Sequence, residues 1–179
     1  MPMRNESDNQ PPIKRFTKKE ISVMEFESSR GERKGERARN KRGAKAHLKG
    51  REFEKKVARW AKRRFKTNEV KTNIFMYGLH VKKPYEVDVW VHEERLLGLE
   101  EFDTWIDCKA LESRVKREHV QLLVAKAGDI KAAKDEGKEK FYFDQLAIAS
   151  TSKFDDDALS YANEHDVACF YYDGKTFNL

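Results

Sequence analysis

The amino-acid sequence predicts an α/β domain in which helices flank a central mixed β-sheet. Three observations lead to this fold class. Helical and strand-like segments follow one another in the order αβββαβαβ, which is typical of helices packed on a sheet. Hydrophobic residues make up 39% of the 179 residues, and most of them lie in residues 47–179, which can therefore bury a core. Residues 1–46 are basic and poor in apolar side chains, so we expect a largely disordered arm there.

The first helix is expected over residues 47–66. Phe53, Val57 and Ala61 recur at the spacing of one helix face, and the other faces carry many lysines and arginines. Residues 30–66 hold 17 basic and four acidic residues, a net charge of +13, whereas the whole chain has a net charge of +6. Positive charge is thus concentrated in the arm and the first helix, which indicates contact with phosphate groups. The alternative for the arm is a solvated linker.

Two strands are expected to follow the first helix. β-Branched and aromatic residues predict the first of them within residues 70–81, and the sequence Lys82-Lys83-Pro84 predicts a turn. Residues 85–92 then alternate, because side chains of a strand point to opposite faces in turn. One face of this strand is expected to carry Tyr85, Val87, Val89 and Val91, and the other Glu86, Asp88, Trp90 and His92.

A third strand is expected over residues 104–111. Residues 93–103 are interpreted as a connection with a turn at Gly98. Alternation within the third strand places one set of side chains on one face and a second set on the other. These sets are Ile106, Cys108 and Ala110, and Trp105, Asp107 and Lys109.

The second half of the chain alternates helix and strand. A helix is expected over residues 114–135, with Gly137 as its stop, and a short buried strand over residues 145–150. A third helix over residues 155–165 leads to a last strand over residues 167–172, which ends at a turn at Asp173-Gly174. Together these elements predict a mixed sheet with helices on both sides.

Several protein classes are excluded by composition. No stretch approaches 18 consecutive apolar residues, so no membrane-spanning helix is expected. The N-terminus lacks an apolar signal core, and two distant cysteines make neither a disulfide framework nor a zinc site. We therefore expect a cytoplasmic protein.

Candidate catalytic residues lie on the second and third strands. Asp107 and Lys109 are two residues apart and point to the same face, and Asp88 sits among apolar neighbours where a lone carboxylate would be costly. If the two strands are adjacent, the carboxylates converge beside Lys109. Two carboxylates with a backbone carbonyl and waters suit Mg²⁺, which can activate a water for attack on a phosphodiester.

With these residues, the order of elements resembles the PD-(D/E)XK nuclease superfamily, and more narrowly its Mrr-like restriction endonuclease branch. The motifs that carry the resemblance are GREFE at residues 50–54, YEVD at 85–88 and IDCKA at 106–110. Residues 120–130 and 147–174 are similar to the helix after the D/E-x-K strand and to the closing strand–helix–strand of that branch. Val87 stands before Asp88, where the family motif has a proline. The resemblance covers roughly residues 47–179.

The resemblance implies a restriction-endonuclease-like fold and roles for individual residues. The implied catalytic set is Asp88, Asp107, Lys109, Glu54 and Gln121. Lys109 would be the catalytic lysine, and Gln121 matches a polar residue near the site in some members. The implied metal ligands are Asp88, Asp107, Glu54 and the backbone carbonyl of Cys108.

Charge and resemblance together lead to a functional hypothesis. We expect a metal-dependent endonuclease that uses Mg²⁺ or Mn²⁺ to hydrolyse DNA phosphodiester bonds in restriction, repair or recombination. A homodimer would suit cleavage of both antiparallel DNA strands, because two sites related by symmetry would then act on them. Phosphate contacts are expected from Arg37, Arg39, Lys41, Arg42, Lys45, Lys49, Arg51 and Lys55.

Two alternatives to the nuclease hypothesis stay open. The first is a nucleic-acid-binding protein that uses the same fold without cutting, because everything except the acids and Lys109 would fit it equally. The second is a protein-interaction domain whose basic arm serves solubility or an RNA scaffold.

Overall fold

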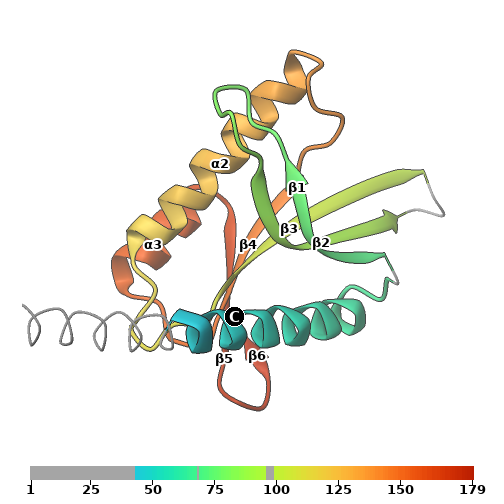
Figure 1. Cartoon of the computed structure of the whole chain (residues 1–179). Coiled ribbons are helices and arrows are strands. Elements are labelled where there is room, and N and C mark those ends of the chain that lie inside the picture. Colours follow the sequence, from blue (N-terminus) through green and yellow to red (C-terminus); the bar gives the residue numbers. More distant parts are fainter. Residues whose placement is uncertain (1–42, 68, 96–98) are drawn as a thin grey trace, which may run out of the picture. The chain divides into compact units, whose positions relative to one another are not determined.

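The strands of the computed structural model form one six-stranded mixed sheet in the order β1-β2-β3-β4-β5-β6 (Figure 1). The structure describes residues 43–67, 69–95 and 99–179, and residues 46–179 form one compact unit. Three helices accompany the sheet within the described residues. The fold is therefore α/β with a mixed sheet, as the sequence predicts.

The sheet combines an antiparallel half with a parallel half. β1 (Val70–Met76), β2 (Tyr85–Arg95) and β3 (Glu100–Lys109) pair antiparallel in chain order. β4 (Gln145–Ser150) pairs parallel with β3, and β5 (Val167–Tyr172) pairs parallel with β4. The short β6 (Phe177–Asn178) closes the sheet antiparallel to β5.

Each face of the sheet packs against helices and forms its own hydrophobic core. The N-terminal helix (residues 43–64) buries Phe53, Val57 and Ala61 against Ile106 and Phe170. α2 (Arg117–Asp135) and α3 (Asp156–Glu164) pack on the other core, which contains Trp105 and Ile148 (Figure 1). Burial of each such large apolar side chain contributes about 1.5–3 kcal/mol. No helix of the described residues is long and apolar enough to span a bilayer.

Most predicted elements match the structure. The bounds of β4 and β5 are those predicted, because a fully buried strand is a compact apolar run. Gly137 follows the end of α2 with φ of 73°, a conformation that glycine adopts without steric cost. α3 begins after Asp155, whose side chain accepts the backbone N–H of Ala158 as an N-cap.

Other elements differ from the prediction at their ends. The first helix includes residues 43–46, which were assigned to the arm, whereas the predicted disorder of residues 1–42 lies outside the described residues. β2 and β3 extend to Arg95 and Glu100, where a connection was predicted, because paired strands can carry exposed charges at a hairpin tip. The predicted turn at Gly98 lies outside the described residues. β6 was not predicted, since two residues carry no alternation.

The predicted faces of β2 are wrong, because the strand changes faces at Asp88. Tyr85 and Val87 pack with the α2 core, whereas Val89 and Val91 pack with the N-terminal helix. β1 changes faces at the same level: Val70 packs with the N-terminal helix, and Ile74 and Met76 with the α2 core.

The change of faces coincides with a gap in the β1–β2 pairing. Thr72 pairs with Val89 and Ile74 with Val87, but the ladder skips the pair between them, Asn73 and Asp88. Asn73 has φ of 53°, in the left-handed region, which breaks the pleat. Asn73 and Asp88 are thus placed between the two cores, where polar side chains can meet.

Candidate active site

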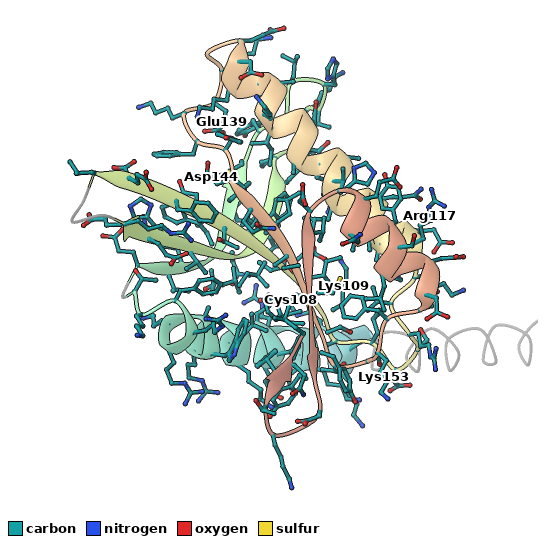
Figure 2. All side chains as sticks on the ribbon, turned by 180° about the vertical axis from the view of Figure 1, so that it is seen from behind. Cys108, Lys109, Arg117, Glu139, Asp144 and Lys153 are labelled. Carbon is teal, nitrogen blue, oxygen red and sulfur yellow. The ribbon has the colours of Figure 1, made fainter. Side chains whose placement is uncertain are left out.

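Asp107 and Lys109 share one face of β3 and form an ion pair. Lys109 Nζ lies 2.7 Å from Asp107 Oδ2, and both side chains are largely buried. The pair lacks hydrogen-bond geometry, and no other donor of the described residues reaches this buried oxygen. Figure 2 shows Cys108 and Lys109 near the centre of the domain, where the strands converge. The buried Oδ2 of Asp107 therefore has the Lys109 ammonium as its partner, but no hydrogen bond.

Asp88 joins this pair through the backbone of β3. Its Oδ2 accepts the N–H of Cys108 at 2.7 Å, at the point where the β2–β3 ladder has ended. Burial, and then the neighbouring charge of Asp107, raise the pKa of Asp88 from 3.8 to about 7. The hydrogen bond from Cys108 acts in the opposite direction. Two carboxylates and one ammonium therefore share a partly buried space.

Glu54 reaches the same space from the N-terminal helix. Its charge is a smaller cause of the raised pKa of Asp88, after burial and the charge of Asp107. Glu54 Oε2 accepts the side-chain N–H of Asn73 at 3.1 Å, and the same amide nitrogen lies 3.2 Å from Glu86 Oε1. The helix can present Glu54 in this way because Phe53 and Val57 fix its apolar face on the sheet.

The thiol of Cys108 takes no part in this arrangement. Its side chain packs with the core under the N-terminal helix, and burial raises the pKa of the thiol well above its usual value. Cys169 is also free, and its pKa is raised to about 11 by burial. Both thiols are therefore protonated and inert, as the alternation of their strands predicts.

No contact between the remaining predicted residues and these acids is found among the described residues. Gln121 is exposed on α2, and among the described residues no hydrogen bond joins it to Asp107 or Lys109. Four of the predicted phosphate contacts are exposed on the first helix: Lys45, Lys49, Arg51 and Lys55. The other four lie outside the described residues: Arg37, Arg39, Lys41 and Arg42.

A cationic groove runs along the N-terminal helix where the chain leaves β3. Its volume is about 600 Å³, and the segment Ala110–Glu112 forms part of its wall. Thr151, which also lines the groove, donates its backbone N–H to the carbonyl of Lys109 at 3.1 Å. The cations that line the groove are Lys49, Lys55, Lys56 and Arg59, and the acids Glu52 and Glu112 line it as well. Lys49 Nζ lies 3.5 Å from Glu112 Oε1, so one of these cations is paired within the groove.

The oxygen atoms of the site fit a hydrated Mg²⁺ better than an ion enclosed by protein. Burial and the charge of Asp107 raise the pKa of Asp88, and a cation bound between the two carboxylates would counter this effect. No group of three or more His, Cys, Asp and Glu side chains in the described part of the chain is placed to hold a metal ion. Mg²⁺ often uses only one or two carboxylates and keeps several waters, which agrees with this arrangement.

Sequence reasoning missed Asn73 and Glu86. Asparagine is depleted in strands, so Asn73 within a β-branched segment was a signal that the strand is interrupted there. Glu86 precedes Asp88 by two residues, the spacing of side chains on one face. Asn73 lies outside the motifs that carry the family resemblance, and Glu86 lies within one of them, YEVD, without an implied role.

Comparison with known proteins shows the fold and nothing more specific. No protein-family model matches the sequence, and no curated protein is similar to it. The chain is similar to the solved structure "Crystal Structure of Protein of Unknown Function AF1548", with a TM-score of 0.51 and 21% sequence identity. The match covers 66% of this chain and 55% of that chain, so this chain spans about half of its length.

Proposed function

We propose that this protein is a metal-dependent endonuclease with a restriction-endonuclease-like fold, of the Mrr-like branch of the PD-(D/E)XK superfamily. One observation carries the proposal. Asp88 binds the backbone between Asp107 and Lys109, so that two carboxylates and one ammonium meet at a partly buried point. This arrangement supports the roles that the sequence motifs imply.

Each residue of the site would act at a definite place. Asp88 and Asp107 would hold a divalent cation with waters, the carbonyl of Cys108 would be a further ligand, and Glu54 would complete the site directly or through a water. A bound Mg²⁺ or Mn²⁺ would stabilise negative charge on the phosphate and lower the pKa of a water. Lys109 would orient the attacking water or stabilise the charge that develops on phosphate oxygens.

The proposed substrate is DNA, held by its phosphates. The groove along the N-terminal helix has four cations and two acids in its wall, and Arg51 adds a further exposed cation on the same helix. Because phosphate contacts release counterions, the affinity for DNA should fall steeply as the salt concentration rises. Lys55→Ala should reduce the slope of log affinity against log salt concentration by about 1, the value of one phosphate contact. A homodimer would act on both strands, and gel filtration that shows a monomer with and without DNA would contradict it.

Plasmid cleavage with Mg²⁺ or Mn²⁺ tests the catalytic proposal. We expect the wild type to cut, and Asp107→Ala and Lys109→Ala to lose activity by at least about 10²-fold, since each removes charge at the reacting phosphate. Asp135→Ala is the matched control, because Asp135 is an exposed acid paired with Lys131 at 3.1 Å on α2. An inert wild type, or normal cleavage by both site variants, would contradict the proposal.

The alternative function is nucleic-acid binding without cleavage. The lack of a preformed group of three metal-ligating side chains among the described residues favours this alternative. DNA binding that persists in the wild type and in both site variants, with no cleavage by any of them, would support it over the nuclease.

A further inference from the structure

The strongest unexplained feature near the proposed site is the backbone of Asn73. Its φ of 53° lies in the left-handed region, which costs most residues about 1 kcal/mol or more but which asparagine tolerates better. This conformation occurs where the β1–β2 ladder skips a pair, directly opposite Asp88. Unfavourable backbone geometry at this point is retained although a regular strand would satisfy more backbone hydrogen bonds.

The side chain of Asn73 links the N-terminal helix to β2. Its amide nitrogen donates to Glu54 Oε2 at 3.1 Å and to Glu86 Oε1 at 3.2 Å. Two carboxylates therefore share one neutral donor, although like charges repel each other. In a regular strand, the Asn73 side chain would point to one face of the sheet in alternation with its neighbours. The left-handed backbone gives the side chain a different direction, so the backbone conformation and the bridge to Glu54 and Glu86 belong together.

We propose that Asn73 is a positioning residue that fixes the orientation of the Glu54 carboxylate beside the candidate site. The inference rests on the proposed function, because it concerns how the site would receive a divalent cation. Asn73 donates a hydrogen bond to Oε2 of Glu54, and no hydrogen bond among the described residues reaches Oε1. An amide suits this task because it orients the carboxylate without neutralising it, as a lysine or arginine would do. Partners that orient metal ligands in this way commonly change metal affinity tenfold or more.

Titration of the full chain with Mn²⁺, without DNA, tests this role by calorimetry. Asn73→Gly is the informative variant, because glycine adopts a positive φ freely and only the amide is lost. We expect Asn73→Gly to weaken Mn²⁺ binding about tenfold, and Asn178→Gly, an exposed control, to bind as the wild type does. Asn73→Asp, which keeps the shape but cannot donate to a carboxylate, should not restore binding.

A double-mutant cycle separates this role from a general effect on folding. If Asn73 acts through Glu54, then Asn73→Gly should not weaken Mn²⁺ binding further in a Glu54→Gln background, and the two effects should be non-additive. A merely structural role predicts additive losses. The same cycle with Glu86→Gln measures how much of the effect of Asn73 on Mn²⁺ affinity depends on Glu86.

The outcomes distinguish this inference from the proposed function. Wild-type binding of Mn²⁺ with unchanged affinity in folded Asn73→Gly would overturn the role of Asn73 and leave the nuclease proposal standing. Additive effects in the Glu54 cycle would also overturn it. A wild type that binds no Mn²⁺ would overturn both the role of Asn73 and the metal-dependent function.

Discussion

Asp103 and Asp107 lie four residues apart on β3, yet their surroundings are opposite. Asp103 Oδ1 accepts hydrogen bonds from Trp90 Nε1 at 2.9 Å and from His92 Nδ1 at 2.8 Å. Asp107 has the Lys109 ammonium 2.7 Å from its buried Oδ2, no hydrogen bond at that oxygen, and a second carboxylate nearby. A carboxylate with complete partners stabilises the fold, whereas one with incomplete partners is costly unless a ligand completes it.

This contrast separates structural from functional acids without reference to any family. Residues that serve a site are often held at the expense of stability, while neighbouring residues compensate. Removing Asp103 should therefore destabilise the protein, whereas removing the charge of Asp88 should stabilise it.

The largest expected effect on stability is that of Asp103→Ala. The substitution leaves the nitrogen atoms of Trp90 and His92 without their acceptor in a largely buried position, which costs about 2–3 kcal/mol. Thermal unfolding should show a fall in Tm of about 10 °C. A loss as small as that of Asp135→Ala on the surface of α2 would contradict the structural role.

Asp88→Asn is expected to stabilise the metal-free protein at about pH 8 by about 1–3 kcal/mol. The folded-state pKa of about 7 lies above the ordinary 3.8, so the carboxylate costs folding free energy once it ionises, up to about 4 kcal/mol. The asparagine variant keeps a weaker acceptor for the N–H of Cys108, which offsets part of the gain.

The pH dependence of this effect has a definite sign. Below about pH 4, both states of the wild type are protonated at Asp88, and the two proteins should be equally stable apart from packing. As pH rises from about 4 to about 7, the wild type loses stability relative to the variant. Denaturant unfolding in EDTA at several pH values measures the difference, and a constant difference would contradict the raised pKa of Asp88.

Divalent cations should stabilise the wild type but not a variant that lacks a site carboxylate. With Mg²⁺ at ten times its dissociation constant, binding to the folded state adds about 1.4 kcal/mol. Asp107→Asn should lose this gain, whereas Asp103→Ala, although less stable, should keep it. Thermal shifts with Mg²⁺ and with EDTA make the comparison. Equal shifts in both variants would mean that the ion binds elsewhere.

The smallest expected effect is that of His92→Gln. The hydrogen bond to Asp103 raises the pKa of His92, so the charged imidazole contributes stability that is fully present below its ordinary pKa of 6.5. That contribution is lost as pH rises through the raised pKa. The variant should therefore be destabilised by about 1 kcal/mol near pH 5.5 and by less near pH 9. Unfolding at the two pH values tests this sign.

The sequence predicted the parallel half of the sheet better than the antiparallel half. β4 and β5 are buried between helices, so their apolar runs define their bounds. β1 and β2 alternate regularly in sequence, but the left-handed residue Asn73 reverses the faces, and hydrophobic alternation contains no information on φ. The outer ends of β2 and β3 were missed because charged residues at an exposed hairpin tip do not differ from a loop in composition.

Only the part of the candidate site that lies on a single strand could be predicted from residue spacing. Asp107 and Lys109 share a face because they are two residues apart, and the structure pairs them. The approach of Asp88 to Cys108 depends on the register of the hairpin, and that of Glu54 on the rotation of a helix. Register and rotation come from packing over the whole domain. Gln121 is exposed on α2, and its role at the site stays a prediction.

The antiparallel order of β1, β2 and β3 has a consequence for how the protein folds. Asp88 and Asp107 belong to one hairpin, whose closure needs neither β4 nor β5. Local hairpins form within microseconds, whereas the parallel pairing of β3 with β4 must enclose the whole of α2 and is slower. The two carboxylates should therefore approach each other early, while water still surrounds them. Refolding in Mg²⁺ is accordingly expected to be faster than refolding in EDTA.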